Sequence, residues 1–192
     1  MSLTRSSAGG ISNLVSPLRI AIDSNAVDHM LDNPELLETI RMAAQRLNFI
    51  FIGNHVILDQ LTATPNEDRR IKLLAIYNSL PKEDVLTRGA YYGISRYGQA
   101  KYADDSNTGM SLSQVKTSGK GGAHDALIAM TASGEADVLI TDDSKLAKKM
   151  RRNGAACVIL TFQSLFVFYE SRTALVNNWI PAVESTERRM RT

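Results

Sequence analysis

Short apolar runs alternate along the chain with longer segments of helical periodicity. Turn residues bound the apolar runs, a pattern typical of buried strands. We predict strands over residues 18–22, 48–53, 137–141 and 157–161. Apolar residues at helical spacing predict a helix after Asn25 and further helices over 34–47, 55–63, 66–80, 124–134, 144–154 and 162–170. Strands that alternate with helices indicate a parallel sheet covered on both faces. We therefore expect a three-layer α/β/α fold with a central parallel sheet of about four to five strands.

The length of 192 residues and the hydrophobic content of 44% suit one domain with a proper core. We predict a flexible leader over residues 1–16, the folded domain over 17–170 and a polar tail over 171–192. Residues 82–121 are rich in Tyr, Gly and polar side chains, and we expect irregular structure or short helices there.

The single cysteine, Cys157, lies in an apolar run, so we expect a core residue. One cysteine excludes a disulfide within the chain and agrees with a reducing compartment. No apolar run is long enough to cross a bilayer, and the first residues lack the apolar region of a signal peptide. We expect a soluble cytoplasmic protein without a membrane partner.

Several aspartates occur at or near the ends of predicted strands. Asp23 ends the first strand, and Asp142 and Asp143 follow the third; Asp59 and Asp125 lie in the helices that flank them. The carboxyl ends of parallel strands share one edge of the sheet, where ligands bind. Carboxylates gathered at one place raise each other's pKa, and a divalent cation relieves that repulsion. Hard oxygen ligands select Mg²⁺ or Mn²⁺, which can assist phosphodiester cleavage.

Each aspartate also has a purely structural interpretation. Asp23 and Asp125 could cap helices. Asp142 and Asp143 could be acids favoured by a helix N-terminus, and Asp59 could lie on a solvated face. Only their joint position at one edge favours a metal site.

Three stretches, "IAIDSN", "HDALIAMTAS" and "VLITDDSKL", resemble in the same order the motifs of PIN-domain proteins. The resemblance covers roughly residues 18–165. It matches Asp23, Ser24 and Asn25 to the first motif, Asp125 to the second, and Thr141 and Asp143 to the last. Most members of that family are Mg²⁺- or Mn²⁺-dependent ribonucleases, and many are toxins of toxin–antitoxin pairs. The resemblance thus implies a PIN-like domain, an RNA substrate and an antitoxin partner.

On that resemblance, Asp23, Asp125 and Asp143 would hold the metal, and Asp59 or Asp142 would complete the catalytic group. Thr141 and Ser24 would orient carboxylates or water, and Asn25 would do the same or only cap a helix. The family usually carries a Glu in the helix after the second strand. Here either Asp59 or Gln60 occupies that place.

Nucleic acid binding needs cations near the acids. The net charge of +2 neither demands nor excludes a polyanionic partner. We predict that Lys116, Lys120 and Lys145 contact phosphates, although a solvated face is the alternative for the lysines after the Asp pair. Tyrosines in the 82–121 segment could stack on unpaired bases of single-stranded RNA or pack in the core. The helix over 162–170 could pack in the core or in a homodimer.

Two other functions stay open. A degenerate PIN-like module would bind RNA or a protein without cleavage, as the missing Glu would allow. A phosphatase or phosphotransfer domain would also use clustered acids, but the phosphatases with an aspartate nucleophile need D-x-D after the first strand, where this chain has D-S-N.

Overall fold

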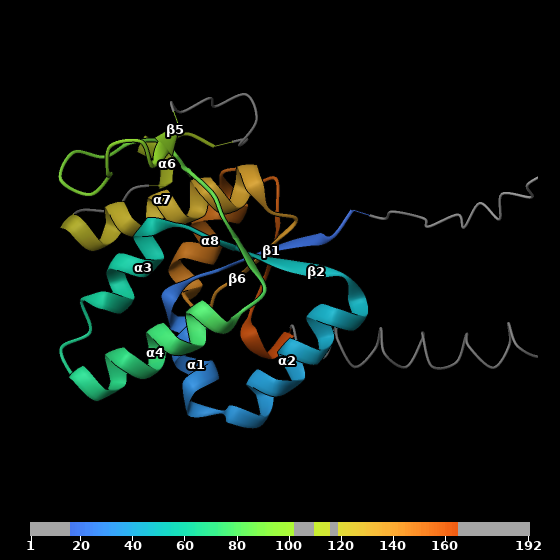
Figure 1. Cartoon of the computed structure of the whole chain (residues 1–192). Coiled ribbons are helices and arrows are strands. Elements are labelled where there is room, and N and C mark those ends of the chain that lie inside the picture. Colours follow the sequence, from blue (N-terminus) through green and yellow to red (C-terminus); the bar gives the residue numbers. More distant parts are fainter. Residues whose placement is uncertain (1–15, 102–109, 116–118, 165–192) are drawn as a thin grey trace, which may run out of the picture.

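The computed structural model describes residues 16–101, 110–115 and 119–164 (Figure 1). Its strands are β1 (Leu18–Ile22), β2 (Phe49–Gly53), β3 (Lys82–Asp84), β4 (Thr87–Arg88), β5 (Ala100–Lys101), β6 (Val138–Ile140) and β7 (Val158–Leu160). Its helices are α1 (Ser24–Asp32), α2 (Pro34–Leu47), α3 (His55–Thr62), α4 (Glu67–Ser79), α6 (Leu112–Val115), α7 (Gly119–Glu135) and α8 (Ser144–Arg152). The predicted tail, the leader before residue 16 and the predicted helix beyond residue 164 lie outside the described residues.

A five-stranded parallel sheet forms the centre of the fold, in the order β3-β2-β1-β6-β7. The prediction of an α/β fold around a parallel sheet is therefore confirmed. The four apolar runs all form strands of this sheet. The fifth strand, β3, was not predicted, because its sequence Lys-Glu-Asp is polar and it lies at the edge of the sheet.

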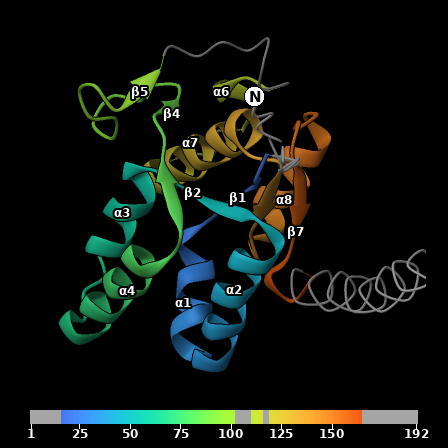
Figure 2. The same ribbon diagram turned by 45° about the vertical axis from the view of Figure 1, so that its right-hand side comes forward.

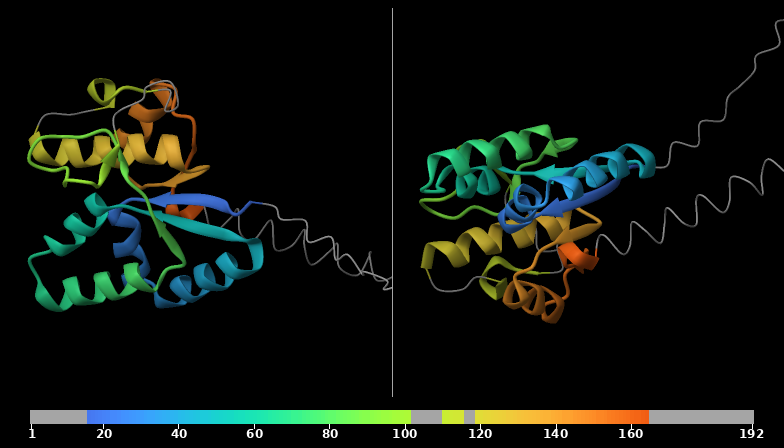
Figure 3. Two further views of the ribbon diagram at one scale, coloured as in Figure 1. Left: turned by 45° about the horizontal axis from the view of Figure 1, so that its top comes forward. Right: turned by 90° about the horizontal axis from the view of Figure 1, so that it is seen from below.

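Helices form a layer on each face of the sheet (Figure 3). Successive residues of a strand pack in the opposite layers. Ile20 and Ile22 of β1 pack in the cluster on the side of α1, α2, α3 and α4. Ala21 between them packs in the cluster on the side of α7 and α8, which also buries Cys157 as predicted. This period of two is the ordinary alternation of strand side chains. The sheet thus has helices on both faces.

Polar residues set the boundaries of the helices below the sheet in Figure 1. Pro34 lies at the first turn of α2, where its missing N–H costs nothing, and it separates α1 from α2 as predicted. Asn48 ends α2 in the left-handed region with φ of 50°. Asn54 and Asn66 cap α3 and α4 with their side-chain oxygens.

The segment between β3 and α7 has more structure than we predicted. The two-residue strands β4 and β5 pair in parallel, and β4 packs beside α7 (Figure 2). Helix α7 begins at Gly119, several residues before the predicted start at His124. Gly121 and Gly122 have low helix propensity and hide this start in the sequence. Asp125 consequently lies inside the helix, and its interpretation as an N-cap is wrong.

Among the helices of the described residues, none combines the length and apolar character that a bilayer crossing requires.

Candidate functional site

The direction of the strand order reverses between β1 and β6. From β1 the chain proceeds to β2 and β3 on one side, and from β6 to β7 on the other. Such a switch point leaves a crevice beyond the carboxyl ends of the two strands, where α/β proteins bind ligands. Asp23 follows β1 directly, and Thr141 follows β6. Ile22 pairs with Ile140 in the sheet, so Asp23 and Thr141 lie opposite each other at this point.

Asp23 is the most enclosed of the candidate acids, with 5% of its surface exposed. Its Oδ1 accepts a hydrogen bond from the Ala26 N–H at 3.0 Å and thereby caps α1. Its Oδ2 accepts a second hydrogen bond from the Thr141 hydroxyl. Burial raises the pKa of Asp23 above its ordinary value, and the nearby charges of Asp142 and Asp143 raise it further, against the two hydrogen bonds.

Asp143 caps the helix on the other side of the crevice. Its Oδ1 accepts hydrogen bonds from the N–H groups of Lys145 at 2.8 Å and Leu146 at 3.0 Å, at the start of α8. Its own N–H donates to the Thr141 Oγ1 at 3.1 Å. The buried Thr141 hydroxyl therefore links the carboxylate that ends β1 to the backbone that carries the next acid. The capping interpretation of Asp23 and Asp143 is confirmed, and capping fixes both side chains at the switch point.

Asp142 connects three elements around the crevice. Its Oδ1 accepts from the Phe162 N–H at 3.2 Å, and its Oδ2 lies 2.9 Å from the His29 Nε2. The His29 ring stacks on Phe162 with 5.5 Å between the ring centroids. Both carboxylate oxygens thus have protein partners, while the charge still acts on Asp23. Sequence reasoning missed this role of His29, since no motif joins residues so far apart in the chain.

Asp125 lies on α7, half-buried, in the second turn of the helix. Burial raises its pKa, and the charge of Asp143 raises it further, whereas His124 lowers it. Helix α7 packs against α8, which Asp143 caps, and this packing brings Asp125 near Asp143.

Helix α3 contributes two polar side chains of different kinds. Asp59 forms an ion pair with Arg96, a residue of the loop between β4 and β5. The side-chain oxygen of Gln60 is buried and has no hydrogen-bond partner within the part of the chain that the structure describes. The charge of Asp59 acts on His55 and does not contribute to the raised pKa of Asp23 or Asp125.

Some of the predicted supporting residues and lysines lie beside the acids, and others lie outside the described part of the chain. Ser24 and Asn25 form the first turn of α1 after Asp23, where Asn25 is exposed. Lys145 is exposed in the first turn of α8, beside Asp143. Lys116 lies outside the described residues, and so does the side chain of Lys120.

The fit of this site to a divalent cation depends on how many ligands the protein must supply. Within residues 16–101, 110–115 and 119–164, no three Asp, Glu, His or Cys side chains converge as a ready coordination shell. Mg²⁺ commonly uses only one or two carboxylates and keeps several waters. Asp23 and Asp143, linked through the Thr141 hydroxyl, supply two carboxylates at one place and so provide that kind of donor set. The residues fit a hydrated hard cation and not a closed structural site.

Comparison with models of protein families finds no match to this chain, and comparison with curated protein sequences finds none. The function must therefore be argued from the arrangement of the residues.

Proposed function

We propose that the protein is a metal-dependent ribonuclease of the PIN-like kind, which hydrolyses phosphodiester bonds in single-stranded RNA. The observation that carries the proposal is the position of Asp23 and Asp143 at the switch point, where the Thr141 hydroxyl donates to the Asp23 carboxylate and accepts from the Asp143 N–H. The negative charges of Asp142 and Asp143 also raise the pKa of Asp23, and that of Asp143 raises the pKa of Asp125. The order of the three sequence motifs agrees with the same function, since each contributes an acid to this group.

Asp23, Asp125 and Asp143 would hold Mg²⁺ or Mn²⁺ together with water, and Asp142 would add negative charge at the site. The bound cation supplies water activation and stabilises negative charge on phosphate oxygens. Thr141 holds Asp23 in place and leaves its orientation little freedom, because the same hydroxyl is fixed by the Asp143 N–H. The chain thereby positions two carboxylates from different strands before any ligand binds.

The RNA strand would approach the acids over the first turn of α8. The exposed Lys145 lies there, and the helix N-terminus favours negative charge. Tyr92 and Tyr97 are fully exposed in the loop between β4 and β5, and such side chains can stack on unpaired bases. A cytoplasmic location, an antitoxin protein and a homodimer are further parts of this proposal.

A second candidate is a PIN-like module that binds RNA without cleavage. Its support comes from α3, where Asp59 is neutralised by Arg96 and Gln60 carries no charge. With fewer free carboxylates, the site would bind a cation more weakly.

Cleavage of mixed single-stranded RNA in Mn²⁺ or Mg²⁺ tests the proposal. The assay compares the wild type with Asp23→Asn, Asp143→Asn and an EDTA control. Asp68→Asn is the matched variant, because Asp68 is an exposed acid in the first turn of α4. We expect cleavage by the wild type and Asp68→Asn, and loss of at least a hundredfold in the two site variants. RNA binding without metal-dependent cleavage by the wild type would instead favour the second candidate.

A further inference from the structure

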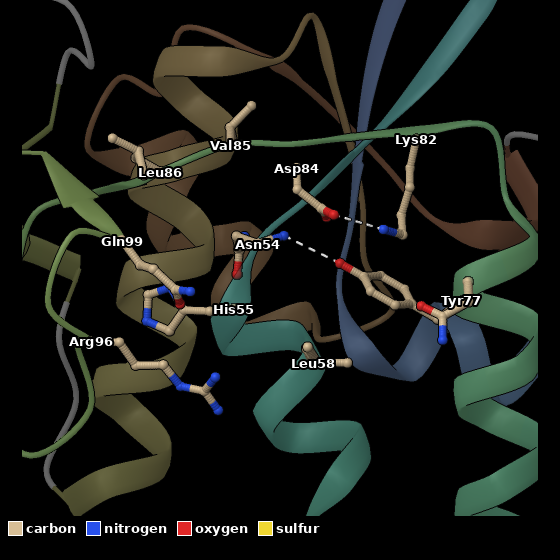
Figure 4. A pocket seen from close by; sticks show the side chains of 11 residues that line it. Asn54, His55, Leu58, Tyr77, Lys82, Asp84, Val85, Leu86, Arg96 and Gln99 are labelled. Atoms are coloured by element: carbon tan, nitrogen blue, oxygen red, sulfur yellow. Dashed lines mark hydrogen bonds and ion pairs between the residues drawn. The ribbon is translucent and has the colours of Figure 1, made fainter.

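A polar pocket, separate from the crevice at the switch point, lies at the carboxyl ends of β2 and β3 (Figure 4). Its volume is about 270 Å³. The residues that define its chemistry are Asn54, His55, Tyr77, Lys82, Arg96 and Gln99. None of them belongs to the aspartate group, so the pocket is a separate feature of the same sheet edge.

The back wall of this pocket is fixed by hydrogen bonds and close packing. The Asn54 Oδ1 caps α3, and the Asn54 N–H donates to the Tyr77 hydroxyl at 3.2 Å. Gly53 packs so closely against Tyr77 and Asp84 that a Cβ atom at this position would overlap both. Burial raises the pKa of Tyr77, so its hydroxyl keeps its proton and can still donate. The wall is therefore formed before a ligand binds.

Two ionisable side chains of the pocket are almost fully buried, Tyr77 with 2% and His55 with 7% of its surface exposed. Figure 4 shows the His55 imidazole between Arg96 and Gln99. The Ile94 backbone lies near the ring, yet neither ring nitrogen has a hydrogen bond of good geometry to any described residue. Burial lowers the pKa of His55, so the neutral ring offers one donor and one acceptor. A buried polar ring without such partners needs a ligand or water to satisfy it.

Charged side chains surround the neutral groups. The Lys82 ammonium lies 2.8 Å from an Asp84 oxygen and 5.0 Å from the centre of the Tyr77 ring. Arg96 pairs with Asp59 and is half-exposed. Both cations line the pocket. Each is paired with an acid, and each has further N–H groups that a phosphate could use.

The pocket is next to the proposed cleavage site. Ala21 of β1 pairs with Ile52 of β2, so Asp23 and Asn54, two residues further along, lie at the same level on neighbouring strands. Neighbouring strands are about 5 Å apart. Helix α3, which begins at His55, packs against α7, which carries Asp125, so the two sites lie on neighbouring helices.

We propose that this pocket binds one unpaired nucleobase of an RNA strand that passes the aspartate group. The proposal rests on the proposed function, and it names the part of the substrate that the protein reads. Neutral donors and acceptors from His55, Gln99 and Tyr77 suit the edge of a base, which presents both kinds of group. A volume just below the ~300 Å³ lower bound of drug-sized sites suits one ring system. Lys82 and Arg96 suit the phosphate beside it.

Titration with ribonucleosides and their 5′-monophosphates, followed by NMR in EDTA, tests the pocket without metal or cleavage. We expect the His55 ring signals to shift on addition of at least one nucleoside, and inorganic phosphate alone to leave them unchanged. Monophosphates should bind more tightly than the matching nucleosides. If no nucleoside shifts these signals, or if inorganic phosphate shifts them equally, the base proposal is overturned.

Variants test the same point with a short single-stranded oligonucleotide in EDTA. We expect Gln99→Leu and His55→Phe each to weaken binding about tenfold. Arg96→Ala should also weaken binding, because it removes a cation proposed to contact the phosphate. Its matched control is Arg41→Ala, since each arginine forms an ion pair on the surface and Arg41 lies on α2, away from the pocket. Equal affinity of the wild type and the folded variants would overturn the proposal. Gln99→Leu keeps this test open if His55→Phe fails to fold, since Gln99 is exposed.

The two proposals can fail separately. Nucleoside binding without RNA cleavage would support the base-binding pocket and refute the ribonuclease proposal. RNA cleavage without nucleoside binding would support the ribonuclease and refute the base-binding pocket.

Discussion

Replacement of Asp23 by asparagine should stabilise the protein when no divalent cation is present. Asn caps a helix about as well as Asp, and its amide can still bond to the Thr141 hydroxyl. The variant exchanges two charged hydrogen bonds of about 1.5–3 kcal/mol each for two neutral ones of about 1 kcal/mol each. It also removes the desolvation of a buried carboxylate, which costs several kcal/mol, and the repulsion from two neighbouring acids. The raised pKa of Asp23 indicates that the unfavourable effects prevail, so we expect a gain of about 1 kcal/mol in the free energy of unfolding.

The pH dependence of this gain follows from the direction of the shift. The folded state holds the Asp23 proton to a higher pH than the unfolded state, whose ordinary pKa is 3.8. Wild-type stability therefore falls as the pH rises from that value through the folded-state pKa. The advantage of Asp23→Asn should be absent below pH 3.8 and should grow as the pH rises through the folded-state pKa of Asp23.

Urea unfolding at several pH values in EDTA measures the effect, and Asp68→Asn serves as control. Mn²⁺ should reverse the order, because a ligand at a hundred times its Kd stabilises the wild type by about 2.7 kcal/mol and the variant much less. A variant that is less stable than the wild type at neutral pH in EDTA would refute the reasoning, since it would mean that the fold favours the Asp23 charge.

Three further predictions concern single side chains. Thr141→Val should lower the free energy of unfolding by about 2 kcal/mol at neutral pH in the same urea assay, because buried Asp23 loses a hydrogen bond. Thr141→Ser keeps the hydroxyl and should therefore keep most of the wild-type free energy of unfolding. Burial raises the pKa of Glu135, but the hydrogen bonds from Lys101 and Arg88 outweigh it and leave the pKa below its ordinary value. The ionised Glu135 therefore stabilises the fold above pH 4.5, and Glu135→Gln should lower the free energy of unfolding there by about 1 kcal/mol, allowing for solvent screening. This loss should vanish in acid, where Glu135 is protonated. Phe51→Ala should cost about 4 kcal/mol by calorimetry, because Phe51 is 1% exposed in the core, and a loss below 1 kcal/mol would contradict that packing.

The sequence was sufficient to predict the sheet where strands are apolar. Most residues of 18–22 and 49–53 are buried between the helices on the two faces of the parallel sheet, and this requirement is visible as short apolar runs that only Arg19 interrupts. β3 carries no such signal, because an edge strand can be polar and its pairing depends on its neighbour. The start of α7 was hidden by glycines that the helix tolerates within its tertiary contacts.

The candidate site was predictable only as far as backbone geometry determines it. Parallel strands bring Asp23 and Asp143 to one edge whatever their side chains do. The partners of the other acids depend on loops and on residues distant in the chain. Asp142 bonds to His29 from α1, and Asp59 bonds to Arg96 from the loop after β4. No local pattern contains these pairs, so their roles required the structure.

Binding of Mn²⁺ to the purified protein, followed by calorimetric titration, tests the central claim most directly. The account predicts saturable binding by the wild type and by Asp68→Asn, with affinity at least tenfold weaker in Asp23→Asn and Asp143→Asn. The absence of binding, or equal affinity in all four proteins, would show that the aspartates at the switch point hold no cation.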